Sequence, residues 1–189
     1  AVPAGAFPDR KRFTAVDALR DNWQTIRDEA AGLFDQGHIR DALKDDDASF
    51  ASFLKVGWKR FYVKWYGEPL PSAQTLCPKT VELVNRIPGV KAAMFALLPP
   101  GVTLNPHRDP FAGSLRYHLG LITPNSRDCH IFVDGQEYFW RDGEDVIFDE
   151  TCVHWVENKT DVTRVIFFAD LERPLRSRVM AWINHHVSN

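Results

Sequence analysis

Apolar residues recur at helical spacing near the start of the chain. Within residues 16–34 the apolar positions that share one face are Val16, Leu19, Trp23, Ile26, Ala30 and Leu33. This spacing predicts an amphipathic helix with one face on a core. The aromatic and β-branched segment 58–66 predicts a strand. A second helix is expected over residues 72–86, closed by Pro88 and Gly89.

After Pro88 the pattern changes to short apolar segments separated by turn residues. The segments expected to be strands are 92–98, 115–123, 130–133, 137–140, 145–148 and 163–171. Proline, glycine, asparagine and aspartate lie between them, as is typical of turns. The series favours a β-sandwich or jelly roll over alternating βαβ units.

The chain is therefore expected to be mainly β with flanking helices, an α+β protein built around a jelly-roll or cupin-like core. A single domain, 1–189, would comprise a helical part over about residues 1–90, a β core over about 91–172 and a C-terminal helix over about 173–189. The helical spacing at the end comes from Leu175, Val179, Ile183 and Val187.

Composition narrows the possible partners and compartments. Lys and Arg total 23 against 25 Asp and Glu, so the net charge of -2 gives no reason to expect nucleic acid. Cys77, Cys129 and Cys152 are odd in number and contain no C-x-x-C pair, which favours a reducing, cytoplasmic environment. No apolar run of about 18 residues occurs, so the chain as given is expected to be soluble. Because it begins at Ala1, a preceding segment could still anchor it.

A candidate metal site begins with His107 and Asp109. In extended backbone these two side chains point to the same side, whereas Arg108 points away. His154 follows the expected strand 145–148 and could supply a third ligand. Two imidazoles and one carboxylate suit Fe(II) and leave coordination positions open, unlike a closed structural zinc site. The H-x-D pattern alone is weak, because most such matches bind no metal.

Cationic residues accompany these candidate ligands. Arg164 begins an apolar strand, and a guanidinium directed inward needs a carboxylate, such as the distal carboxylate of 2-oxoglutarate. Arg116 and His118 lie on one face of the segment 115–121. Alternatively, Arg116 pairs with a core acid such as Asp149.

Together these motifs resemble the aspartyl/asparaginyl β-hydroxylase family. The resemblance rests on Pro106-His107-Arg108-Asp109, the segments 115–121, 140–144 and 148–150, His154 and Arg164. The upstream segments 19–23, 57–61 and 111–118 are most similar to bacterial lipid A 2-hydroxylases. The likeness covers nearly the whole chain.

The resemblance implies a double-stranded β-helix and an Fe(II)- and 2-oxoglutarate-dependent dioxygenase that uses dioxygen. Residue by residue, it assigns the iron to His107, Asp109 and His154, and cosubstrate contacts to Arg164, Arg116, His118 and Trp58. Animal members lack the carboxylate ligand, so Asp109 makes this triad the more conventional one. Ala96 stands where the animal peptide hydroxylases have a serine, which leaves the cosubstrate contacts on that side open.

The leading expectation for function is hydroxylation at C2 of a secondary acyl chain of lipid A, at the cytoplasmic face of the bacterial inner membrane. One alternative is β-hydroxylation of an aspartyl or asparaginyl residue in a peptide, or of the free amino acid. Another is a catalytically silent β-barrel that binds a metal or a small acid. The C-terminal arginines Arg173, Arg176 and Arg178 suit an anionic bilayer surface, although a helix docked on the barrel fits the same pattern.

Overall fold

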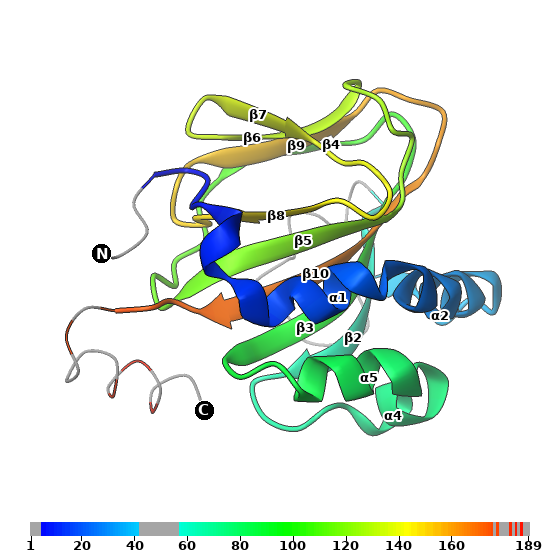
Figure 1. Cartoon of the computed structure of the whole chain (residues 1–189). Helices are drawn as coiled ribbons and strands as arrows, with labels where there is room; N and C mark the ends of the chain where they lie inside the picture. The colour runs from blue at the N-terminus through cyan, green and yellow to red at the C-terminus, as the bar shows by residue number, and fades with distance from the viewer. Residues whose placement is uncertain are drawn as a thin grey trace.

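Two antiparallel sheets face each other, and helices cover the far side of the larger one (Figure 1). The computed structural model describes residues 5–41 and 57–175, together with positions 177, 182, 184 and 186. The larger sheet consists, in order, of β1 (Arg40–Asp41), β2 (Lys59–Trp65), β3 (Val90–Leu98), β10 (Arg164–Glu172), β5 (Ser114–Ile122) and β8 (Asp145–Phe148). The smaller sheet consists of β4 (Thr103–His107), β9 (His154–Asn158), β6 (Cys129–Val133) and β7 (Gln136–Phe139). This arrangement confirms the predicted jelly-roll class.

The two predicted helices are each divided. Residues 16–34 form α1 (Asp17–Asp21) and α2 (Trp23–Asp35), preceded by the short 3-10 turns η1 (Arg10–Arg12) and η2 (Thr14–Val16). The break falls at Asn22, whose side-chain amide donates to the Ala18 carbonyl at 2.8 Å. Residues 72–86 form α4 (Pro71–Leu76) and α5 (Pro78–Asn85). Pro78 has no N–H to continue α4, but it fits the first position of α5.

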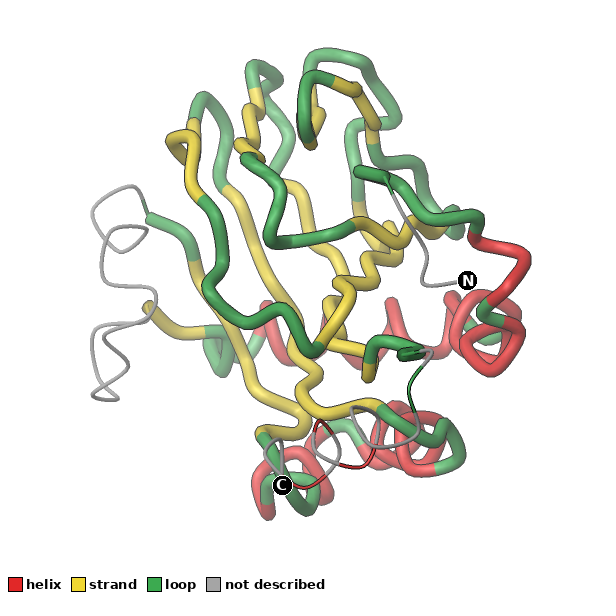
Figure 2. Tube along the Cα trace, turned by 90° about the vertical axis from the view of Figure 1, so that its left-hand side faces the viewer, coloured by secondary structure: helices red, strands yellow, loops and turns green. Residues whose placement is uncertain are grey.

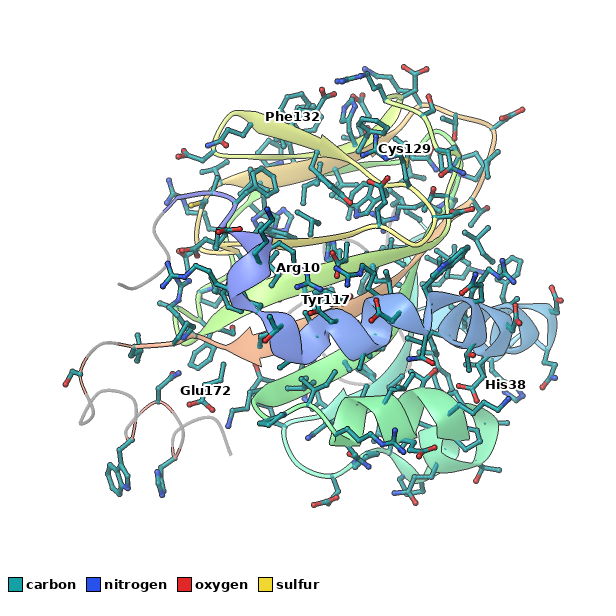
Figure 3. All side chains as sticks on the ribbon, in the orientation of Figure 1. Arg10, His38, Tyr117, Cys129, Phe132 and Glu172 are labelled. Atoms are coloured by element: carbon teal, nitrogen blue, oxygen red, sulfur yellow. The ribbon has the colours of Figure 1, made fainter. Side chains whose placement is uncertain are left out.

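The helix-covered face of the larger sheet is apolar. Side chains of β3, β5 and β10 that point this way include Phe95, Leu115, Leu119, Phe167 and Ala169, all buried. Figure 2 shows the helices gathered along the lower and right-hand sides of the strands, so that they close this face. Tyr117 lies near α1 with Arg10 close by (Figure 3), and its hydroxyl donates to Asp145 at 3.1 Å. This face is the main core.

The opposite face of the same sheet meets the smaller sheet. Apolar residues from both sheets form a second core there, among them Met94, Ile131, Trp140, Phe148 and Val156. Buried polar residues interrupt it, among them Arg116, His118, Arg164 and Asp170. The space between the sheets is therefore where chemistry can take place.

Three strands were not anticipated: β1, β4 and β9. The polar sequence of β4 and its Pro106 conceal it, and its pairing with β9 is irregular between Leu104 and His107. His154 accordingly begins a strand instead of following one in a loop.

The expected C-terminal helix lies mostly outside the described residues, including Arg176, Arg178, Val179, Ile183 and Val187. Arg173 is described, and it is buried, with its guanidinium bound to Asp149 at 2.7 and 2.8 Å. The prediction that Arg173 faces a bilayer is therefore wrong. No helix in the described ranges combines the length and the apolar character needed to span a membrane.

Candidate metal centre

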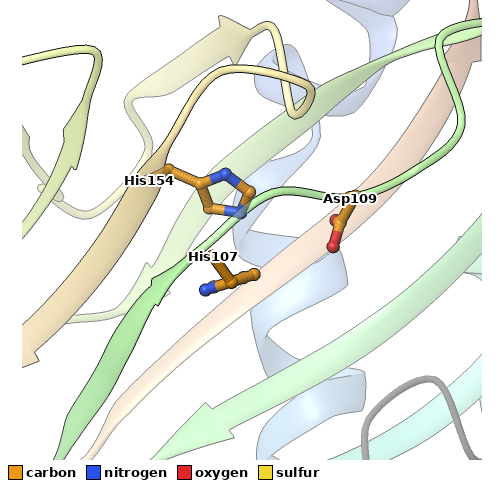
Figure 4. A group of neighbouring side chains, drawn as sticks. All are labelled: His107, Asp109 and His154. Atoms are coloured by element: carbon orange, nitrogen blue, oxygen red, sulfur yellow. The ribbon is translucent and has the colours of Figure 1, made fainter.

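The three predicted ligands meet at one end of the smaller sheet. His107 ends β4 and His154 begins β9, and the strand register sets them directly opposite each other. Asp109 follows on the loop after β4, and its carboxylate turns towards both rings (Figure 4). The candidate ligand atoms of the three residues lie within 4.8 Å of one another. One ion with bonds of about 2 Å could contact all three after small side-chain movements.

Backbone contacts orient both imidazoles. The Nδ1 atom of His107 lies 2.7 Å from the Asn105 carbonyl, and that of His154 lies 3.0 Å from the Cys152 carbonyl. Because a carbonyl can only accept, each Nδ1 carries a hydrogen, so Nε2 is the nitrogen of each ring that a metal could use. Burial lowers the pKa of His154 to about 4, so this ring is neutral at physiological pH, the form that binds a metal.

Asp109 supplies the negative charge. Burial acts to raise its pKa, but Arg116, His154 and His107 outweigh that effect and the pKa is lowered. One carboxylate oxygen, Oδ2, contacts Arg116, which leaves Oδ1 for an ion. The backbone N–H of Asp109 donates to the Glu150 carbonyl at 3.0 Å and fixes the loop. Two neutral nitrogens and one anionic oxygen on one side of an ion fit Fe(II) with open positions.

Arg116 is held by acids on several sides. Its guanidinium contacts Asp109, Glu150 and Asp170, with the Nε to Asp170 Oδ1 distance at 3.0 Å. It also stacks on Phe168, 4.2 Å from the ring centre. Burial raises the pKa of Glu150 to about 8 and also raises that of Asp170, so the three acids around this cation do not carry three full negative charges at neutral pH.

The alternative expectation, that Arg116 pairs with a core acid, holds for Glu150 and Asp170, but Asp149, the acid named for it, is wrong. Arg116 lies opposite Phe148 in the register of β5 with β8. Because successive residues of extended backbone point to opposite faces, Asp149 points away from Arg116 and Glu150 points back towards it. Glu150 therefore reaches Arg116, whereas Asp149 binds Arg173.

A pocket extends from the metal centre between the sheets. It is lined mainly by apolar side chains and contains the predicted site residues His107, His154, Arg116, His118, Arg164 and Trp58. Ala96 also lines it, so no side-chain hydroxyl is present where the animal proteins have serine.

Arg164 is the unusual group in this pocket. Its side chain is 2% exposed and lies over Trp140, with 4.3 Å between the guanidinium carbon and the ring centre. No carboxylate in the described part of the chain pairs with it. Burial lowers its pKa to about 10, which still leaves it charged at neutral pH. A buried cation without an anion is costly, and a ligand carboxylate would offset that cost.

His118 is the second group without a partner. Within the described ranges neither ring nitrogen forms a hydrogen bond, and burial lowers its pKa well below the usual value. Arg164 and Arg116 add to that shift. The neutral ring can therefore offer one donor and one acceptor to a bound ligand.

Sequence reasoning missed three residues of the site. Trp140 and Glu150 stood in the motif segments 140–144 and 148–150 without a role of their own, and Trp140 packs directly under Arg164. Asp170 was not among the candidates. A signal for Asp170 was available, because alternation from Arg164 along β10 brings residues 166, 168 and 170 to the same face.

With the fold and the site described, the chain can be compared with known proteins. The sequence model of the family described as Aspartyl/Asparaginyl beta-hydroxylase matches residues 20–174. The chain therefore belongs to the aspartyl/asparaginyl β-hydroxylase family.

Among curated relatives, the ornithine lipid ester-linked acyl 2-hydroxylase of Rhizobium tropici is 41% identical over 128 residues, which is 66% of this chain and 46% of that protein. Human aspartyl/asparaginyl beta-hydroxylase is 28% identical over 84% of this chain and 21% of its own length. Human aspartate beta-hydroxylase domain-containing protein 2 is 31% identical over 84% of this chain and 44% of its own. The chain thus spans less than half the length of each of these relatives.

The solved structure of a Pseudomonas putida prolyl-4-hydroxylase aligns with a TM-score of 0.51 at 18% identity. The alignment covers 86% of this chain and 98% of that one. At this identity the likeness supports the jelly-roll fold alone.

Proposed function

We propose that the protein is an Fe(II)- and 2-oxoglutarate-dependent hydroxylase. The observation that carries the proposal is the buried Arg164, which pairs with no anion among the described residues and lines the same pocket as His107 and His154, two members of the triad that Asp109 completes. A dicarboxylic cosubstrate satisfies both features at once, because one end can chelate an ion while the other neutralises Arg164.

When bound, the iron would supply the activation of dioxygen, with 2-oxoglutarate oxidised to succinate and carbon dioxide. One oxygen atom of the dioxygen enters succinate, and the other converts a substrate C–H bond to C–OH. The chain's residues bind and orient. Arg164 holds the distal carboxylate, and His118, whose ring nitrogens have no hydrogen-bond partner among the described residues, offers a hydrogen bond beside it. The apolar lining from Leu104, Ile131 and Val156 excludes water from the reacting centre.

For the substrate we propose a fatty acyl chain of a membrane lipid, hydroxylated at C2, with a secondary acyl chain of lipid A as the leading candidate. The similarity to an ornithine lipid acyl 2-hydroxylase supports an acyl substrate. We further propose that the reaction takes place at the cytoplasmic face of the bacterial inner membrane, where the free thiols of Cys77, Cys129 and Cys152 would stay reduced. The second candidate is β-hydroxylation of an aspartyl or asparaginyl residue, which the more distant relatives favour.

The test combines cosubstrate turnover with product mass. Purified protein with Fe(II), ascorbate and labelled 2-oxoglutarate is incubated with lipid A, with ornithine lipid and with an aspartyl peptide, and carbon dioxide release is measured. Release that is stimulated by a lipid, together with one added oxygen at C2 of an acyl chain, is the expected result. Asp109→Ala should release none. If the protein consumed no 2-oxoglutarate, either alone or with any of the three substrates, the result would instead favour a catalytically silent binding protein.

A further inference from the structure

An irregularity in β2 changes which side chains face the site. Alternate residues of this strand point to the helix-covered core, and Phe61 and Val63 both do so. The register with β3 shifts between Tyr62 and Lys64, a β-bulge. As a result Tyr62, opposite Met94, and Trp65, opposite Ala92, both lie on the site face.

These two rings and the next one form a continuous aromatic group, here called the aromatic rim: Tyr62, Trp65 and Tyr66. The Tyr62 and Trp65 ring centres are 4.8 Å apart, and those of Trp65 and Tyr66 are 5.1 Å apart and nearly perpendicular. Trp65 is 38% exposed and Tyr66 is 37% exposed. Two neighbouring aromatic rings thus remain partly in contact with solvent at this point.

The aromatic rim adjoins the metal centre. Across the sheet, Trp65 pairs with Ala92, Ala92 with Asp170, and Asp170 with Arg116. The small side chain of Ala92 is therefore what separates Trp65 from the acids around Arg116. Burial raises the pKa of Tyr66 to about 12, with added contributions from the negative charges of Asp170 and Glu150. The Tyr66 ring accordingly lies towards the acidic side of the site.

Tyr66 also has a costly backbone conformation. Its φ is +39°, in the left-handed region that bulky residues rarely adopt. Its N–H donates to the Lys91 carbonyl at 2.8 Å, which holds the conformation in place. Glycine would have met the turn without strain, so a tyrosine here points to a role for its side chain.

We propose that the aromatic rim is the substrate-side wall of the active site and guides a lipid acyl chain towards the iron. This inference rests on the proposed hydroxylase function and extends it by naming the residues that recognise the substrate. Arg164 lines the pocket at the proposed cosubstrate end, and the rim lies beyond Asp170 from Arg116 in the register of the larger sheet.

Apolar contact favours an acyl chain over an acidic peptide. The cations near the rim already have neighbours: Arg116 is bound by Asp109, Glu150 and Asp170, and Arg60 lies over the Tyr62 ring, with 4.8 Å between the guanidinium carbon and the ring centre. An uncharged hydrocarbon chain gains contact with the aromatic rings and with the apolar lining of the adjoining pocket, whereas an aspartyl carboxylate would lose its hydration there.

A binding measurement tests the proposal without turnover. Tryptophan fluorescence of the full chain is followed in detergent micelles that carry dibromostearoyl phosphatidylcholine, whose bromines quench on contact. Trp65→Phe should remove most of the lipid-dependent quenching. The matched control is Trp155→Phe, because Trp155 stacks on Phe132, which lies in the smaller sheet (Figure 3), whereas the rim belongs to the larger one. Equal quenching in the wild type and in Trp65→Phe would overturn the proposal.

A kinetic measurement separates recognition from folding. Tyr66→Gly removes the ring at a φ that glycine adopts freely, so the melting temperature should not fall. The KM for ornithine lipid or lipid A should rise about tenfold, as expected for the loss of one apolar aromatic contact. Phe34→Ala, which removes an aromatic ring 44% exposed on α2, is the control and should leave the KM unaltered.

The outcomes distinguish the two proposals. If the wild type hydroxylates no lipid while its quenching is lost in Trp65→Phe, the acyl reaction fails but lipid contact at the rim stands. If the wild type hydroxylates lipid and Tyr66→Gly keeps its KM, the rim has no role in recognition. A rise in KM for an aspartyl peptide, in place of a lipid, would overturn the acyl assignment.

Discussion

The two faces of the larger sheet use the same strands for opposite purposes. Along β5, Leu115, Tyr117 and Leu119 point to the helices, whereas Arg116 and His118, between them, point to the smaller sheet. All five side chains are buried. One face gains stability from apolar contact, and the other carries charged and polar groups that burial penalises.

The difference shows how this fold can support a costly site. Apolar packing under α1, α2 and α5 is continuous and does not depend on a ligand. Across the sheet, Arg164 and His118 lack partners in the described part of the molecule. Such groups lower the free energy of unfolding until a ligand pairs with them. The apolar packing on the helix-covered face stabilises the fold enough to offset that loss. The two faces should therefore respond differently to substitution.

The largest expected effect is on the site side, at Asp109. Asp109→Ala removes the anionic ligand while both imidazoles remain. Loss of a residue that only supports a ligand typically lowers metal affinity by about 10- to 100-fold, so loss of this ligand itself should lower Fe(II) affinity by more than about 100-fold. Turnover should become undetectable. Anaerobic calorimetric titration with Fe(II) or Mn(II) measures this. The control is Arg108→Ala, since the exposed Arg108 contacts only the Thr151 carbonyl among the described residues. Unchanged affinity in Asp109→Ala would remove it from the metal centre.

On the helix-covered face the expected effect is on folding alone. Phe167 is fully buried against Phe95, with ring centres 5.9 Å apart. Phe167→Ala should lower the free energy of unfolding by about 3 to 5 kcal/mol. Metal affinity of the folded fraction should not change, because the side chain lies on the far face from the ligands. Urea unfolding and metal titration on the same sample test this, and a large loss of affinity would show that the two faces are coupled.

Lowering the pH should destabilise the metal-free protein through the buried histidines of the site face. The pKa of His154 is about 4 in the fold against an ordinary 6.5. Between these values the unfolded chain binds the extra proton, so the free energy of unfolding falls as pH decreases, by up to about 3 kcal/mol. His118, whose pKa is also lowered, acts in the same direction. Urea unfolding across this pH window should show the slope, and His154→Gln should flatten it. An equal slope in that variant would mean that His154 is not the group that titrates.

The sequence predicted much of the site because the chemistry depends on residue type and simple alternation. His107 and Asp109 share a side in any extended backbone, and Arg164 stands at the start of a strongly apolar strand. The jelly-roll class followed from short apolar segments with turn residues between them. The break before α5 was also readable, since Pro78 cannot continue a helix.

Other features depend on tertiary contacts that no local pattern contains. Residues 103–107 are a strand because β9 pairs with them, despite Pro106. The partners of Arg116 come from strands and loops far along the chain, so Asp149 was as reasonable a choice as Glu150 until the register was known. The left-handed backbone conformation of Tyr66 could not be predicted, because glycine is the residue that normally indicates this conformation in a sequence.

The last prediction sets function against stability at one residue. Arg164→Met keeps a long side chain over Trp140 but removes the buried charge. Charged hydrogen bonds contribute about 1.5 to 3 kcal/mol each, so the KM for 2-oxoglutarate should rise at least about tenfold. Fe(II) affinity should barely move. Without cosubstrate the free energy of unfolding should stay level or increase by about 1 kcal/mol, because an unpaired buried cation has been removed.

Arg173→Met is the matched control, because Arg173 is equally buried but pairs with Asp149. It should lose stability, since Asp149 is left without its partner, and keep its KM for 2-oxoglutarate. Thermal unfolding and cosubstrate titration of both variants separate the cases. If Arg164→Met lost stability as Arg173→Met does and kept its KM, Arg164 would belong with the structural arginines, and the cosubstrate would have to bind elsewhere.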